Sequence, residues 1–178
     1  PGPVKAAATT PQGPFRFCLN TSTISGQKLG VLHLIEIASA AGYDGIELWV
    51  SDVKKYLAQG NSIQSLASFL SSKNIVVEDA ISFTSWMVED EEKRKAALAE
   101  LEEEMKIMAV LGCHRIAAQS AGVTKDQPIY FQTAGYRYRE ILALGRDYNL
   151  MSLLEFWGTS VTLLTLSKAM AIVKRAKI

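Results

Sequence analysis

Two patterns of apolar residues alternate along the chain. Short apolar runs predict buried strands, and longer stretches with apolar residues at every third or fourth position predict amphipathic helices. We expect strands at residues 15–19, 45–50, 75–77 (running on toward 82), 115–118 and 150–154. We expect helices at residues 29–41, 62–74 (which includes the capping residues Ser62 and Asn74), 90–111, 131–148 and from 163 onward. The pattern therefore predicts one strand–loop–helix unit repeated five times.

The helix-to-strand joins support this repeat. Gly42 and Gly112 stand between a helix and the next strand in two similar segments, residues 41–46 and 111–116. Glycine suits the left-handed conformation that ends many helices. Strands that alternate with helices imply a parallel sheet with right-handed crossovers. Five units fit either an open doubly wound sheet or the first part of an eight-unit barrel, which typically has about 250 residues.

The segment after the first strand separates these two folds. A nucleotide-binding doubly wound fold carries a glycine-rich phosphate loop there, whereas this chain has Asn20-Thr21-Ser22-Thr23-Ile24-Ser25. We therefore expect an α/β fold of the (β/α) TIM-barrel type, incomplete here, with five of eight units and parallel strands in sequential order. We expect residues 15–178 to form this partial barrel domain and residues 1–14, rich in Pro, Ala, Thr and Gly, to be a flexible lead-in.

Composition narrows the function. The 178 residues are 48% hydrophobic with a formal net charge of +1, which fits one globular domain and argues against nucleic acid or an anionic membrane as the main partner. No apolar run approaches the roughly 20 residues of a membrane-spanning helix.

We expect a cytoplasmic protein, with export to the periplasm as the alternative because residues 4–10 are rich in alanine. Cys18 and Cys113 are expected as buried thiols, and the glutamates of helix 90–111 as a solvated face.

Polar and aromatic residues where strands end are the candidate site, because a parallel barrel places its active site at the carboxyl ends of its strands. Glu155 stands out, since a charge at the tip of the apolar run 150–154 is costly unless something binds it. The other candidates at strand tips are Asn20, Thr21, Glu47, Trp49, Ser82, Phe83, Trp86, Gln119, Ser120 and Trp157. Rings beside hydrogen-bonding groups suit a sugar. A salt bridge for Glu155 and core packing for the tryptophans are the alternatives. His33 and His114 lie away from these tips, and we interpret both as structural.

Three segments carry a family resemblance: Gly45-Ile46-Glu47-Leu48-Trp49, Arg115-Ile116-Ala117-Ala118 and Leu154-Glu155-Phe156-Trp157-Gly158. Together they resemble the xylose isomerase-like barrel superfamily of sugar phosphate isomerases and epimerases. The resemblance implies a divalent ion (Mn, Mg, Co or Zn) held by Glu, Asp, His and Glu from strands five to eight. It implies that Glu155 is the first of these metal ligands and, in epimerases, a catalytic carboxylate that moves a proton next to a carbonyl. The substrate-binding residues that line the sugar pocket would be Asn20, Glu47, Trp49, Gln119 and Trp157.

The departure from the family pattern is that no later strands supply the Asp, His and second Glu. We therefore expect the chain alone to be inactive, and the resemblance leaves open whether it carries the ion. The expected partner is a small-molecule sugar, with no nucleic acid and no membrane, and a homo-oligomer is compatible with the sequence. A non-catalytic sugar-binding barrel is the main alternative. An endonuclease IV-like DNA-repair enzyme ranks lower, because the early strand tips carry Glu47, Ser82 and Gln119 where that group has histidines.

Overall fold

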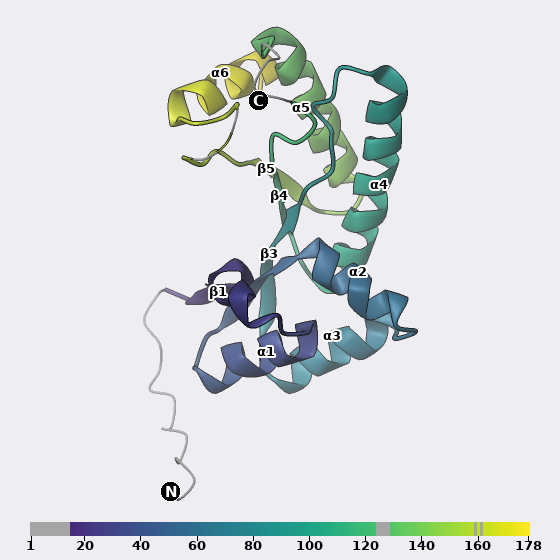
Figure 1. Cartoon of the computed structure of the whole chain (residues 1–178), viewed down its shortest axis with the longest axis vertical. Helices are drawn as coiled ribbons and strands as arrows, with labels where there is room; N and C mark the ends of the chain where they lie inside the picture. Colours follow the sequence, from purple (N-terminus) through teal and green to yellow (C-terminus); the bar gives the residue numbers. More distant parts are fainter. Residues whose placement is uncertain (1–14, 124–128, 159, 161) are drawn as a thin grey trace, which may run out of the picture.

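The computed structural model describes residues 15–123, 129–158, 160 and 162–178. Five strands form one parallel sheet in the order β1-β2-β3-β4-β5 (Figure 1). Their bounds are β1 Cys18–Asn20, β2 Gly45–Trp49, β3 Val76–Ser82, β4 Arg115–Ala118 and β5 Met151–Leu154. The predicted partial barrel, with parallel strands in sequential order, is therefore confirmed. The predicted lead-in at residues 1–14 lies outside the described residues.

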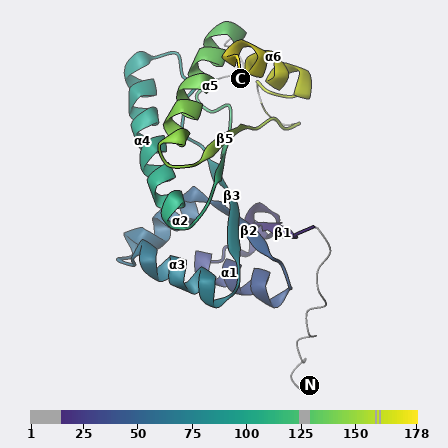
Figure 2. The same ribbon diagram turned by 180° about the vertical axis from the view of Figure 1, so that it is seen from behind.

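The helices follow the predicted repeat, with two additions. They are α1 Val31–Ala40, α2 Val50–Ala58, α3 Ile63–Ser72, α4 Glu91–Val110, α5 Phe131–Arg146 and α6 Leu166–Ala176. The sequence analysis missed α2 and a 3₁₀ helix, η1, at Thr21–Gln27. The signal for α2 was present, because Val50 and Val53 are buried at helical spacing. Helices α2 to α5 follow the same side of the sheet, on the right in Figure 1 and on the left in Figure 2.

Side chains alternate between two faces along each strand, because successive residues of a strand point to opposite sides. The face that packs against the helices is apolar and includes Leu19, Ile46, Leu48, Val77, Ala80, Ile116 and Ala118. The opposite, inner face carries Asn20, Glu47 and Asp79, which are matched across β1, β2 and β3. A register shift between Ile46 and Glu47 pairs Glu47 with Asp79. This irregularity brings Asp79 onto the inner face.

Two predictions about burial are wrong. Cys18 is exposed, whereas Cys113 is buried as expected, because β1 is an edge strand and Cys18 lies on its inner face. For α6, helical spacing in the sequence predicts an inner side formed by Leu163, Leu166, Met170 and Val173. The buried residues of α6 are instead Ala169, Ile172 and Ala176, and Leu166 and Met170 are exposed. The reason is close packing of α6 on α5: a Cβ atom at Gly135 would lie 2.6 Å from the Arg175 Cβ. Small residues permit this approach.

The acidic face of α4 is also not fully solvated. Glu104 is 5% exposed. Its Oε2 accepts a hydrogen bond of 2.6 Å from the Ser82 hydroxyl at the end of β3, and its Oε1 accepts one of 2.9 Å from the Lys54 ammonium on α2. Lys54 also pairs with Glu100 at 2.7 Å. Glu104 therefore ties α2 and α4 to the tip of β3, a contact that only tertiary packing creates.

None of the described helices is long and apolar enough to cross a bilayer.

Replacing Gly145 with alanine should destabilise the fold. The new Cβ would lie 2.3 Å from the carbonyl oxygen of Leu150, the residue before β5. Overpacking of this kind costs about 1–3 kcal/mol or more, against a gain in helix propensity of about 1 kcal/mol. We expect a net loss in the free energy of unfolding, measured by urea denaturation. Gly26→Ala is the control, because a Cβ atom at that position would have no neighbour within 4 Å. Equal stability of the two variants would contradict the close approach.

Replacing Glu104 with alanine should also lower the free energy of unfolding. The Ser82 hydroxyl would lose its carboxylate partner in a buried setting, which costs about 1–3 kcal/mol. Glu103→Ala on the same helix should change stability little, because Glu103 is exposed and pairs with Lys106 at the surface. Equal effects of the two substitutions in urea denaturation would show that the Glu104 contact contributes nothing.

Candidate functional site

The first part of the site is a hydrogen-bonded corner between β1 and β2. The Asn20 side-chain amide donates to Oε2 of Glu47, and its oxygen accepts from the Ser22 backbone N–H at 2.8 Å. The Thr21 hydroxyl donates to the Glu47 carbonyl oxygen at 3.0 Å. Asn20 therefore both caps the 3₁₀ helix η1 and fixes the Glu47 carboxylate. This corner brings together two of the predicted substrate-binding residues.

The second part lies at the ends of β4 and β5. Glu155 directly follows β5, and its backbone N–H donates to the Ala118 carbonyl at 3.4 Å. The side chain of Gln119, which is buried, lies close enough to the Glu155 carboxylate to lower its pKa. The second carboxylate oxygen, Oε2, is buried and has no hydrogen-bond partner within the described residues. A buried acceptor without a partner is unusual in proteins, so this oxygen is available to a ligand.

The carboxylates of the inner face influence one another. Burial raises the pKa of Glu47, and the negative charge of Glu155 raises it further, while the Asn20 hydrogen bond opposes both. Burial also raises the pKa of Glu155, against the Gln119 hydrogen bond. Burial raises the pKa of Asp79 to about 6; the Ala80 N–H opposes the shift, and the charge of Glu47 adds to it. Carboxyl groups from β2, β3 and β5 thus share one inner space.

Asp79 is the residue that the sequence analysis missed. It lies in the middle of β3 rather than at its tip, and Glu78 stands beside it in the sequence. Strict alternation along the strand cannot tell which of these two neighbours faces inward. The register shift at Ile46 and Glu47 decides it. Glu78 instead forms ion pairs with Arg16 at 2.6 Å and with Arg115 at 3.3 Å.

An aromatic wall flanks the Glu47 corner. The rings of Trp49 and Phe83 lie with centroids 5.1 Å apart at an interplanar angle of 52°. Phe83 is 49% exposed, so its ring is accessible. The two residues come from the ends of β2 and β3, as predicted for a rim of strand tips. A face of this kind can pack against the C–H groups of a sugar.

Two predicted aromatic positions behave differently. Trp86 is 1% exposed, packs 6.2 Å from the Tyr138 ring, and donates its indole N–H to the Gln119 carbonyl oxygen. It therefore supports Gln119 from the core and does not line the site. Trp157 is half-buried, and its backbone N–H donates to the Leu163 carbonyl at 3.1 Å. This bond shapes the loop after β5, and the place of Trp157 in the sugar pocket stays a prediction.

Hydroxyl groups hold the loop after β5 against the tip of β4. The Thr162 hydroxyl donates to the Ser120 hydroxyl at 2.7 Å, and Ser120 and Ser160 lie 3.3 Å apart, oxygen to oxygen. The Ser160 hydroxyl also accepts from the Leu163 N–H at 3.0 Å. All three hydroxyl residues are buried. Ser120, a predicted tip residue, thus stabilises the loop that follows Glu155.

The described residues do not fit a catalytic divalent ion. They include no group of three or more His, Cys, Asp or Glu side chains that could hold one, and catalytic zinc sites use about three protein ligands. His33 lies on α1, and His114 contacts the Asn149 carbonyl oxygen before β4. Neither histidine is part of the carboxylate site. Glu155 offers one carboxylate only, and its role as a metal ligand stays a prediction.

Comparisons with solved structures show the same fold. The IOLI protein, whose crystal structure holds a zinc atom, is 20% identical with a TM-score of 0.81, covering 92% of this chain and 60% of that chain. D-psicose 3-epimerase with D-fructose is 19% identical with a TM-score of 0.72, covering 90% and 60%. The probable 3-DHS dehydratase AsbF from Bacillus anthracis is 16% identical with a TM-score of 0.73, covering 92% and 60%. At these identities the likeness establishes the fold.

The chain spans about 60% of the length of these three structures. A comparison of the sequence with curated proteins found no significant match. A comparison with family models matched residues 35–177 to the xylose isomerase-like TIM barrel. This match covers most of the chain, from α1 through α6. Together with the sheet order, it shows that the chain belongs to the xylose isomerase-like TIM barrel family.

Proposed function

We propose that this chain provides the sugar-binding and proton-transfer groups of a sugar isomerase or epimerase. The observation that carries the proposal is the pair of half-buried carboxylates, Glu47 and Glu155, on one inner face beside the Trp49–Phe83 wall. Epimerisation next to a carbonyl, and isomerisation through an enediol, both begin with removal of a proton next to the carbonyl. A carboxylate with a raised pKa is a stronger base for this step. The names of D-psicose 3-epimerase and related structures agree with this class of reaction.

The two carboxylates have different partners and so take different roles. Glu155 has a buried oxygen without a partner among the described residues, so this oxygen is free to accept the proton. Gln119 lies beside its carboxylate and opposes the rise of its pKa. Glu47 is held by Asn20, and its charge raises the pKa of nearby acids. We assign Glu155 as the base and Glu47 as an acceptor for sugar hydroxyls, with the aromatic wall packing on the C–H face of the ring.

The family resemblance implies a divalent metal ion, but the described residues of this chain do not supply enough ligands to hold one. A polarising ion of the kind seen in the IOLI crystal structure would need more ligands than the described residues bring together. We therefore assign proton removal to the carboxylates of this chain and expect no net turnover from the 178-residue chain alone. A sugar-binding barrel without catalysis is the second candidate, and the lack of a three-ligand group among the described residues favours it.

Hydrogen exchange in D-fructose separates the two candidates. If Glu155 is a base, the chain in D₂O should exchange the proton next to the carbonyl faster than buffer does, without net conversion to D-psicose. Glu155→Gln should lower this exchange at least about tenfold, since a positioned base contributes about 10²–10⁴. Exchange is followed by loss of the proton NMR signal, and sugar binding by titration of the same sample.

The control is Glu92→Gln, an exposed carboxylate in the first turn of α4. It should exchange the sugar proton at the wild-type rate. Saturable D-fructose binding without any exchange would identify the non-catalytic barrel. Absence of both binding and exchange would overturn the sugar site itself.

A metal titration tests the fit of the ion directly. Because the described residues bring no group of three or more His, Cys, Asp or Glu side chains together, calorimetry with Mn²⁺, Mg²⁺, Co²⁺ or Zn²⁺ should show no tight site, and Glu155→Gln should give the same result as the wild type. Tight stoichiometric binding that Glu155→Gln abolishes would contradict this expectation. Net conversion of D-fructose by the chain in the presence of one of these ions would contradict the expected inactivity.

A further inference from the structure

A groove of about 560 Å³ runs along the outer side of α5, on the surface that faces away from the sheet. Helices α4 and α5 lie side by side there (Figures 1 and 2), and an ion pair of 2.9 Å between Arg94 and Glu140 joins them. Four of the residues that line the groove are arginines: Arg94, Arg137, Arg139 and Arg146. None of them belongs to the candidate site.

Two of the four arginines are already paired, and two are not. Arg137 donates through both of its terminal nitrogens to the Glu89 carboxylate, at 3.0 and 3.1 Å, and Arg94 is held by α5 as described. Arg139 and Arg146 form no ion pair in the part of the chain that the structure describes. The groove therefore offers two guanidinium groups to acceptors from another molecule, and carboxylates match the guanidinium group in a bidentate way.

The Tyr136 ring helps to orient one of the unpaired guanidinium groups. The Arg139 guanidinium carbon lies 5.4 Å from the centroid of this ring, and its Nη2 donates to the Arg175 carbonyl oxygen at 3.5 Å. Tyr136 is 54% exposed, so the stacked pair lies at the surface. Tyrosine and arginine are the residues that protein interfaces concentrate. A guanidinium that is already oriented also loses less side-chain entropy when it binds.

The groove side of α5 has the spacing of a helix–helix contact. Tyr136, Arg139, Ala143 and Arg146 follow one another at intervals of three, four and three residues, so they lie on one side of the helix. Ala143 is small and exposed, which lets a second helix approach between the two arginines. Arg139 and Arg146 are seven residues apart, or about 10 Å along the axis. A helix lying along α5 matches this distance with two carboxylates seven residues apart.

We propose that this groove binds an acidic helix of a protein partner, whose two carboxylates, seven residues apart, pair with Arg139 and Arg146. Charge complementarity supports an acidic occupant, because residues 129–178 contain seven Lys and Arg but three Asp and Glu. Glu140 also lines the groove. A chain of phosphates would meet this negative charge, whereas two separate carboxylates avoid it. The groove would thus dock a partner on the side of the barrel that is opposite to the carboxylate site.

The probe is a fluorescently labelled helical peptide of about 20 residues, long enough to form a helix by itself, with two glutamates seven residues apart. A second peptide carries glutamine at both positions. Fluorescence anisotropy with the 178-residue chain should show saturable binding of the glutamate peptide, at least about tenfold tighter than that of the glutamine peptide. Arg139→Gln combined with Arg146→Gln should remove this difference. Arg139→Lys combined with Arg146→Lys should restore it only in part, because lysine keeps the charge without the bidentate geometry.

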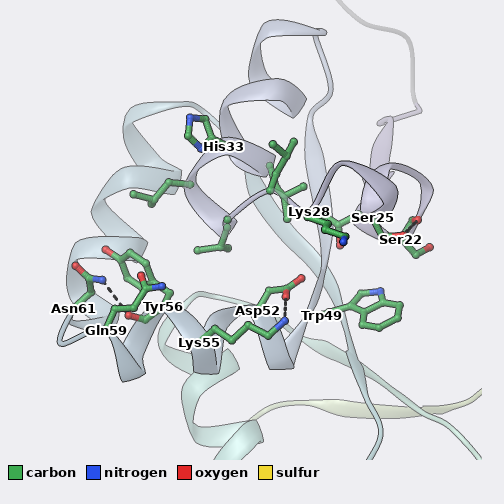
Figure 3. Close-up of a pocket in the computed structure, with 16 residues that line it drawn as sticks. Ser22, Ser25, Lys28, His33, Trp49, Asp52, Lys55, Tyr56, Gln59 and Asn61 are labelled. Atoms are coloured by element: carbon green, nitrogen blue, oxygen red, sulfur yellow. Dashed lines mark hydrogen bonds and ion pairs between the residues drawn. The ribbon is translucent and has the colours of Figure 1, made fainter.

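The matched control removes two positive charges elsewhere, by Lys28→Gln combined with Lys55→Gln. These lysines line a separate cavity between η1 and α2 (Figure 3), where Lys55 pairs with Asp52 at 2.9 Å. The control should bind the glutamate peptide as the wild type does. Equal weakening by the arginine and lysine variants would show a diffuse charge effect and overturn the groove. Equal affinity for the two peptides would overturn it as well.

Two further measurements separate other occupants from the acidic helix. Duplex DNA that binds more tightly than the glutamate peptide, with the same dependence on Arg139 and Arg146, would overturn the proposal in favour of a polyphosphate. Sedimentation of the chain without peptide should show no self-association that depends on these arginines. Self-association that the double Gln variant abolishes would replace the separate partner with a second copy of this chain.

Discussion

The carboxylate site depends on one constraint, the division of the parallel sheet into an apolar face and a polar face. Alternate side chains of β1 to β4 pack under the helices and form the core. The side chains on the opposite, inner face are not covered by a helix of the described residues. Polar groups can therefore lie on this face if they hydrogen-bond to one another. Asn20 and Glu47 do so across β1 and β2, whereas Glu155, beyond β5, keeps one carboxylate oxygen without a partner among the described residues. Burial raises the pKa of both Glu47 and Glu155, and the charge of Glu155 adds to the shift at Glu47.

Hydrogen bonds from helix α4 and from the core fix the carboxyl ends of the strands. Glu104 reaches from α4 to Ser82, and Trp86 donates to the Gln119 carbonyl from the core. The hydroxyls of Ser120 and Thr162 tie the loop after β5 to the end of β4. These contacts fix the backbone next to the residues that we assign to the ligand. Precise placement of a base or acceptor needs this kind of support, because small displacements cost large factors in rate.

The basicity of the inner face comes from its surroundings. Burial raises the pKa of Glu47, Asp79 and Glu155, and like charge adds to the shift at Glu47 and Asp79. The Trp49 ring borders this face, since Trp49 follows Glu47 by two positions on β2 and packs against Phe83. A carboxylate base and an accessible ring therefore stand side by side at the end of the sheet.

The sequence by itself determined the strand–helix repeat, the parallel order of the sheet and the family, because apolar periodicity and the Gly42 and Gly112 joins are local signals. It also placed Glu47 on β2 and Glu155 directly after β5. Only the tertiary structure decided that Asp79 faces inward, that Glu104 is buried, that Trp86 belongs to the core and that Cys18 is exposed. These outcomes depend on register, on helix rotation and on what packs opposite each residue. Contacts between residues distant in the sequence set all three, and no local pattern encodes them.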